Sequence, residues 1–277
     1  MIYYVDHERI NELKDFVRQR NIYSCRIACL LESYGTNHDF ARFWLQYNDK
    51  GKVVSAVASY YGDSSVQLSE QSDVQELAEL VEMMGCASVL CSRPLLAGES
   101  ECGIVMSLCE DEKKDAVPSG EMQIVHEPDI SMVYGLLKSC SGDGFEVPAY
   151  EDFLLDLSHK IRHGTALCTG LMYKDRLISS AMTVAQSEEC AVIGAVAAEA
   201  EYRGRGWGSV CVRELCTRLT EMYRSMGHPH TKNRIFIMRS KDRNESFYKK
   251  LGFINAEEFY IQRRIDRKKS SPSYVAG

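Results

Sequence analysis

Hydrophobic and polar positions follow a clear order in the second half of the chain. Apolar residues recur at helical spacing over Ile130 to Leu137 and over Phe153 to Ile161. Two strand-like apolar runs follow, Ala166 to Tyr173 and Leu177 to Val184, and the short polar segment 174–176 joins them. This pattern predicts two helices followed by a β-hairpin.

A third apolar run, residues 190–198, leads into a glycine-rich loop. After the loop, one apolar helix face is marked at spacings of three and four residues by Val212, Leu215, Leu219 and Met222. Further on, the pattern predicts a buried strand at 235–238, a short helix at 244–251 that Gly252 closes, and a last strand at 253–265.

The first half repeats part of this order. Residues 43–47 and 53–61 flank a turn as a hairpin, Val74 to Val81 has helical spacing, and 87–91 is strand-like. The repetition favours a duplicated and diverged half, although few residues are identical between the halves. We expect an α/β (α+β) fold, with a mixed central β-sheet flanked by helices and built from two tandem halves.

A charged run separates the two halves. It covers residues 110–120, ends in Pro118, Ser119 and Gly120, and has no apolar periodicity, which is typical of a linker. The predicted division is therefore an N-terminal domain at 1–110, a linker at 111–122 and a C-terminal domain at 123–277.

Composition and charge narrow the classes of function. The chain is 45% hydrophobic and 26% charged, as expected of a globular protein. Residues 1–120 hold 11 basic and 19 acidic side chains, whereas 121–277 hold 22 and 20. This slight basic excess suits a ligand rich in phosphate but lies far below what nucleic-acid binding needs, so we expect no nucleic-acid partner.

Membrane, redox and metal signals point to an ordinary intracellular protein. No apolar run reaches the roughly 18 residues of a membrane helix, and the N-terminus lacks a signal-peptide pattern, so we expect a cytoplasmic protein without a membrane partner. The 11 cysteines are scattered without Cys-x-x-Cys pairs and are expected to be reduced. His228 and His230 lack further ligands, so we expect surface histidines and no metal.

The glycine-rich loop carries the strongest chemical signal. It reads Arg-Gly-Arg-Gly-Trp-Gly over 203–208 and lies between a predicted strand and a predicted helix. Glycines permit φ > 0 and let a phosphate approach the backbone, and the N–H groups at a helix start bind anions. The spacing fits neither the G-x-G-x-x-G dinucleotide motif nor the P-loop.

The remaining pattern, Arg-x-x-Gly-x-Gly at Arg203, Gly206 and Gly208, resembles the coenzyme A pyrophosphate signature of the GNAT N-acetyltransferase family. A second segment, 244–253, is similar to that family's later motif, which commonly ends Tyr-x-x-x-Gly-Phe. Many members place an Asn seven residues before that Tyr, where this chain has Lys241 and carries Asn244 instead. The resemblance covers about residues 121–265.

The resemblance implies acetyl-coenzyme A as the acyl donor and a set of site residues. Backbone N–H groups of Val196, Ala197 and Ala198 would hold the pantetheine arm and the thioester carbonyl. Tyr248 would protonate the departing thiolate, and Glu199 is the candidate base that deprotonates the amine. The remaining residues implied to bind the coenzyme are Arg203, Gly204, Arg205, Gly206, Trp207, Gly208, Ser209 and Asn244.

Structural interpretations of the same residues stay open. Tyr248 is also typical of a packed core tyrosine, Glu199 of a solvated residue at a strand end, and Trp207 of a side chain that packs with Cys211 below the loop. In the first half, Ser72 and Gln75 predict a capping box at the helix start, where acidic residues would repel a pyrophosphate. We expect no coenzyme in that half.

The leading hypothesis is an N-acetyltransferase in which a primary amine, of a small molecule or a protein, directly attacks the thioester. The alternative is a non-catalytic sensor that binds acyl-coenzyme A, and a purely structural pairing protein is a third class. If the first half lines one side of the acceptor site, its acidic charge favours a cationic acceptor. The chain could also form an oligomer.

Overall fold

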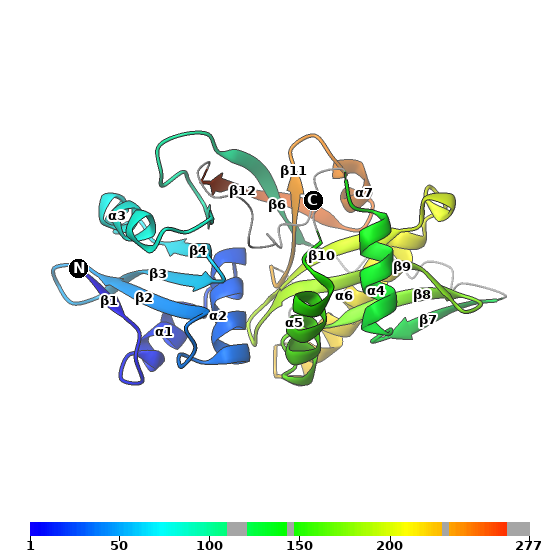
Figure 1. Ribbon diagram of the computed structural model, residues 1–277, viewed down its shortest axis with the longest axis horizontal. Coiled ribbons are helices and arrows are strands. Elements are labelled where there is room, and N and C mark those ends of the chain that lie inside the picture. The colour runs from blue at the N-terminus through cyan, green and yellow to red at the C-terminus, as the bar shows by residue number, and fades with distance from the viewer. Residues whose placement is uncertain (110–120, 143–146, 229–232, 265–277) are drawn as a thin grey trace.

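The computed structural model describes residues 1–109, 121–142, 147–228 and 233–264 (Figure 1). The helices are α1 (Ile10–Phe16), α2 (Ile22–Tyr34), α3 (Val74–Met84), α4 (Ile130–Ser139), α5 (Tyr150–Arg162), α6 (Trp207–Ser225) and α7 (Glu245–Lys249). The strands are β1 (Ile2–Tyr4), β2 (Ala41–Tyr47), β3 (Val53–Tyr60), β4 (Asp63–Leu68), β5 (Ser88–Cys91), β6 (Glu101–Leu108), β7 (Met122–His126), β8 (Cys168–Tyr173), β9 (Arg176–Gln186), β10 (Ala191–Ala198), β11 (Ile235–Ser240) and β12 (Phe253–Arg263).

The strands form one 12-stranded mixed sheet whose order reads the same from both ends. The order is β1-β2-β3-β4-β5-β12-β6-β11-β10-β9-β8-β7, so β1 to β5 correspond to β7 to β11. The parallel pair β4–β5 matches the parallel pair β10–β11, and the neighbouring pairs are antiparallel in both halves. The two halves therefore share one element order, as the repeated sequence pattern predicted.

The halves exchange their last strands at the centre of the sheet. Strand β6, from the first half, lies between β11 and β12 of the second half, and β12 lies between β5 and β6. Gly103 makes the central pair possible, because a side chain there would collide with the ring of Phe259 on β12. Each half thus completes the sheet of the other, and neither sheet half is complete within one segment of the sequence.

Helices cover both faces of the sheet. α6 and α7 pack over Ile193 and Ile237 on the face that we call the α6 face, which also carries α3. α1, α2, α4 and α5 cover the opposite face, which we call the α4 face. In Figure 1, α4 and α5 lie in front of the second-half strands, and α6 lies behind them.

The halves also meet through a buried polar cluster between α2 and α5, which lie side by side near the middle of Figure 1. Asp156 accepts hydrogen bonds from the hydroxyls of Tyr34 (2.5 Å) and Tyr60 (2.6 Å) and pairs with Lys160 (2.9 Å). Burial acts to raise the pKa of Asp156, but the Lys160 ammonium and the two phenols outweigh it and hold the pKa below its ordinary value. The cluster joins helices from opposite halves.

The structure confirms the helices and strands predicted in the second half and the hairpin, helix and strand predicted in the first. One detail was wrong: Ser72 does not cap α3, because the carboxylate of Asp73 accepts the N–H of Glu76 and Ser72 instead donates to the carbonyl of Val54. The predicted linker at 110–120 lies outside the described residues. All 11 cysteines are unpaired, and no helix within the described ranges is long and apolar enough to cross a membrane.

Candidate active site

A gap opens between β10 and β11. The two strands pair in parallel only from Ala191 to Ile193 against Ile235 to Ile237, and beyond this point they have no paired residues. A β-bulge distorts β10 at the same point, between Gly194 and Ala197, where Ala195 adopts φ 48° although it has a side chain. The second half of β10 therefore presents one backbone edge to the gap.

Alternation along β10 shows which N–H groups face the gap. The N–H of Glu199 donates to the carbonyl of Ile178 on β9. Since successive N–H groups of a strand point to opposite edges, Ala197 directs its N–H toward β9, while Val196 and Ala198 direct theirs into the gap. Of the three backbone donors implied by the sequence, two point toward the gap.

The glycine loop forms the start of α6. Gly204 has φ +73° and Gly206 has φ +85°, a region that other residues rarely adopt, and nothing lies within 4 Å of a Cβ built on either one. Val210 is the first residue whose N–H bonds within the helix, to the carbonyl of Gly206. The N–H groups of Trp207, Gly208 and Ser209 are thus left for an outside acceptor at the positive end of a 19-residue helix.

The side chains around the loop fix its shape. Arg203 donates through Nε to the carbonyl of Ala198 (3.0 Å), which ties the loop to β10, and Arg205 lies over the ring of Tyr202. Trp207 packs on the same core cluster as the buried Cys211, as predicted. The Trp207 Nε1 is buried and has no hydrogen-bond acceptor among the described residues, so one more donor is left unsatisfied there.

Tyr248 lies on α7 across from the start of α6. It is only 3% exposed and packs edge-on against Phe247 and Phe253, and burial raises the pKa of its hydroxyl to about 12. Phe247 in turn lies where a Cβ on Gly208 would touch it, at 3.7 Å. α6, α7 and the bulge of β10 therefore come together on the α6 face.

Asn244 and Glu199 lie at the edges of this region. Asn244 precedes α7 with φ 61°, and its exposed side chain makes no capping hydrogen bond within the described chain. The carboxylate of Glu199 pairs with the guanidinium of Arg176 at 2.8 Å, and Glu201 lies 3.4 Å from the same guanidinium. Glu199 is therefore held at the end of β10 rather than free to move.

Arg239 is a residue that the sequence pattern did not reveal. Its side chain is 2% exposed, donates to the carbonyls of Ser240 (3.0 Å) and Lys241 (2.7 Å), and pairs with Glu245 (3.3 Å) at the first position of α7. Arg239 fixes the segment that leads from the gap to α7 and Tyr248. No spacing rule signals such a contact, because an arginine inside a strand is ordinarily a surface residue.

The corresponding region of the first half lacks the same features. β4 and β5 also pair only over three residues, Asp63 to Ser65, but the register between β3 and β4 runs unbroken, so β4 has no bulge. The start of α3 is already occupied by the carboxylate of Asp73. That half therefore presents neither a free helix start nor a bulged edge.

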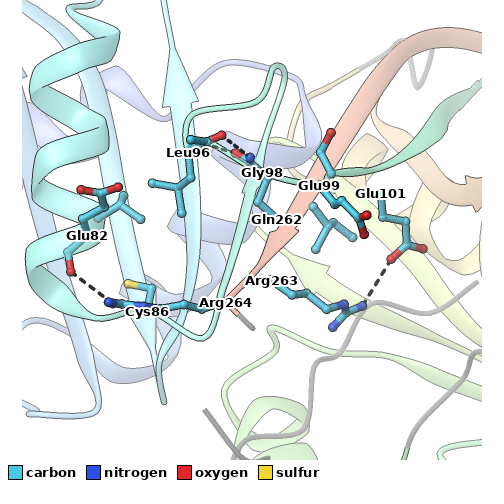
Figure 2. Close-up of a pocket in the computed structure, with 13 residues that line it drawn as sticks. Glu82, Cys86, Leu96, Gly98, Glu99, Glu101, Gln262, Arg263 and Arg264 are labelled. Atoms are coloured by element: carbon cyan, nitrogen blue, oxygen red, sulfur yellow. Dashed lines mark hydrogen bonds and ion pairs between the residues drawn. The ribbon is translucent and has the colours of Figure 1, made fainter. Parts of the chain in front are cut away.

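A large hollow in the first half lies elsewhere. This cavity of about 730 Å³ is lined by α3, by the connection between β5 and β6 at residues 92–100, by the start of β6 and by the end of β12. Figure 2 shows acidic and basic side chains mixed around it. Arg263 pairs with Glu101 at 3.5 Å. The side-chain oxygen of Gln262 accepts hydrogen bonds from the backbone N–H groups of Leu95 and Leu96 and so fixes this connection to β12. The connection 92–100 has no helix corresponding to α7, and none of the lining residues belongs to the loop of α6.

The described residues contain no cluster of His, Cys, Asp and Glu that could hold a metal ion. The features that they do bring together are a bulged strand edge, a free helix start with two glycines in the left-handed region, and a buried tyrosine. They all lie within one strand–loop–helix unit and the helix facing it. Such donors suit an anionic phosphate group together with a carbonyl oxygen that gains negative charge.

Residues 130–253 match the family model of the acetyltransferase (GNAT) family. This part of the chain is a GNAT-family acyltransferase domain, and it contains the bulge, the glycine loop and Tyr248. No curated protein matches the sequence.

Solved structures share the fold over nearly the whole chain. A tandem GNAT protein from the clavulanic acid biosynthesis pathway aligns with 95% of this chain and 98% of its own at TM-score 0.58 and 13% identity. A Drosophila protein aligns over 96% and 99% at TM-score 0.64 and 15% identity, and a GCN5-related N-acetyltransferase from Sphaerobacter thermophilus over 95% and 95% at TM-score 0.56 and 12% identity. The chain thus has the fold of tandem GNAT proteins.

Proposed function

We propose that this protein transfers an acetyl group from acetyl-coenzyme A to a primary amine, with direct attack of the amine on the thioester. The observation that carries the proposal is the placement of the β10 bulge beside the free start of α6. A single extended ligand can place its pyrophosphate on the N–H groups of 207–209 and its acyl end in the gap between β10 and β11. The unpaired cysteines suit a reducing cytoplasm.

The coenzyme supplies an activated acyl group when it is bound, and this chain's residues position it and move protons. The N–H groups of Val196 and Ala198 lie along the gap, where they stabilise negative charge on a carbonyl oxygen. Arg203 and Arg205 flank the loop and add positive charge beside the phosphates.

Two protons leave the acceptor during the reaction. An ammonium group loses the first proton before its nitrogen can attack, and Glu199 remains our candidate to receive it, in competition with its ion pair to Arg176. As the N–C bond forms and the C–S bond breaks, the nitrogen loses its second proton. Tyr248 donates its hydroxyl proton to the departing sulfur and recovers one from the nitrogen through water, so it ends unchanged.

The alternative function is a sensor that binds acyl-coenzyme A without turnover. The first half supports it, since a half without a bulge or a free helix start does not contribute a second active site. Titration with acetyl-coenzyme A followed by a thiol-release assay on a panel of primary amines separates the two functions. Release of one coenzyme A thiol per acetylated amine supports the enzyme. Tight binding of acetyl-coenzyme A without thiol release in the presence of any of the amines supports the sensor.

A further inference from the structure

Glu257 lies on β12 at the level where the gap opens. The register aligns Glu257 with Val105 of β6, and Val105 with Met238 of β11, one residue beyond the last pair between β11 and β10. Neighbouring strands lie about 4.8 Å apart, so the backbone of Glu257 is roughly 10 Å from the edge of the gap.

A β-bulge directs this side chain to the α4 face. Between Asn255 and Glu257 the register shifts by one residue, at Ala256. Asn255 pairs with Met106 on the α6 face, and Glu257 pairs with Val105 on the α4 face. Bulges commonly redirect a side chain beside an active site. Its neighbour Glu258 points to the α6 face and pairs with Lys241 at 2.6 Å.

The carboxyl of Glu257 is left available. It makes no hydrogen bond or ion pair with any residue that the structure describes, and its side chain is exposed to solvent. Partial desolvation by the surrounding atoms raises the pKa of Glu257. After burial, the charge of Glu257 is the next cause that raises the pKa of the Tyr23 hydroxyl, which donates to the backbone carbonyl of Glu258. A partly desolvated carboxylate without a counter-ion attracts a cation.

The second substrate has one side from which to approach. If the coenzyme occupies the α6 face, with its phosphates at the start of α6, the acyl end in the gap is open to an acceptor only from the α4 face. Glu257 is on that face, beside Tyr23 of the acidic first half. Its distance from the gap is too long for contact with the reacting nitrogen but suits a second charge on the same acceptor.

We propose that Glu257 binds a second, distal ammonium group of the acceptor, so that the substrate class is a diamine or a longer polyamine rather than a monoamine. This inference rests on the proposed function for the location of the reacting end. It assigns to β12 the selection of the acceptor, separate from the chemistry at β10 and α7.

The test is equilibrium binding of 1,4-diaminobutane and of butylamine to the full-length protein saturated with coenzyme A, in wild type, Glu257→Gln and Glu258→Gln. We expect wild type to bind the diamine more tightly than the monoamine, and Glu257→Gln to weaken diamine binding roughly tenfold while leaving butylamine unchanged. Glu258→Gln, one residue away on the opposite face, is expected to bind both amines as wild type does.

Equal diamine affinity in wild type and Glu257→Gln, or an equal loss in Glu258→Gln, would overturn the proposal. Circular dichroism and coenzyme A affinity check that each variant is folded. Because binding is measured without turnover, the result stands even if the protein proves to be a sensor. Thiol release with 1,4-diaminobutane tests the proposed function separately, and there Glu257→Gln is expected to raise the KM for the diamine with a smaller change in kcat.

Discussion

The hydroxyl of Tyr34 on α2 donates a 2.5 Å hydrogen bond to the carboxylate of Asp156 on α5, across the boundary between the two sequence halves. The same carboxylate holds the ammonium group of Lys160, and both partners of this ion pair are 11% exposed. The halves are therefore joined by a desolvated charge cluster in addition to the shared sheet. Buried ion pairs lose much stability when one partner is removed, since the other charge is left without compensation.

Replacing Asp156 by Asn is expected to lower the free energy of unfolding by about 3 kcal/mol, because the buried Lys160 loses its ion pair with Asp156. The folded-state pKa of Asp156 is below its ordinary value of 3.8, so its contribution is present above that value and is lost as the pH falls through the lower folded value. Urea unfolding at several pH values measures both effects. Asp39→Asn, at an exposed pair with Arg42, is the control and is expected to change stability by less than about 0.5 kcal/mol.

Cutting the chain at an inserted protease site within 110–120 is expected to leave the two fragments associated. Strand β6 of the first fragment is hydrogen-bonded on both sides by strands of the second, so separation requires unfolding of the central sheet. Size-exclusion chromatography of the cut protein, before and after denaturant is added, measures whether the two fragments stay associated. Elution of two separate folded fragments from the cut native protein would contradict the strand exchange.

The same exchange bears on the predicted division into domains at 1–110 and 123–277, which remains a proposal. A fragment that begins at residue 123 lacks β5 and β6, so one edge of β11 and both edges of β12 are left unpaired. We expect this fragment to aggregate when it is expressed alone. Co-expression with residues 1–110 is expected to yield it in soluble, folded form. A fragment 123–277 that is monomeric and unfolds cooperatively on its own would show that the first half is not needed for the fold.

Replacing Tyr248 by Phe is expected to lower kcat roughly 100-fold with little change in coenzyme affinity, because the variant loses the hydroxyl proton and keeps the packing. Burial raises the pKa of this hydroxyl to about 12, so between pH 6 and 10 it stays protonated and should cause no loss of rate as the pH rises. Tyr223→Phe, at a buried tyrosine of the same core, is the control. A basic limb below pH 10 that vanishes in Tyr248→Phe would contradict the raised pKa, and a kcat in Tyr248→Phe equal to that of wild type would contradict the role as proton donor.

Periodicity predicted the second half well because its helices each bury one face. α2 escaped prediction, since ten of its 13 residues are buried between the halves and leave no polar stripe to mark a helix. The strand exchange was also missed, because it pairs residues such as Phe253 and Leu108 that lie far apart in sequence. Ser72 and Asp73 are both good caps, and only the structure distinguishes them.

The glycine loop was located from sequence because its residue types are specific, whereas Arg239 and Glu257 were not. Arg239 gains its place from carbonyls and a carboxylate brought together by the fold. Glu257 faces the α4 face only because of the bulge at Ala256, and a shift of one residue would have turned it to the opposite face. Neither contact has a sequence signature.

The central claim is that one coenzyme binds at the start of α6, and titration calorimetry with acetyl-coenzyme A tests it most directly. We predict one site per chain in wild type, and at least roughly 100-fold weaker binding in Gly206→Glu, where φ is +85° and a carboxylate would face the phosphates. Gly51→Glu introduces the same charge at a hairpin glycine with φ +70° and is expected to bind as wild type does. Unchanged affinity in Gly206→Glu, or two sites per chain in wild type, would contradict the account.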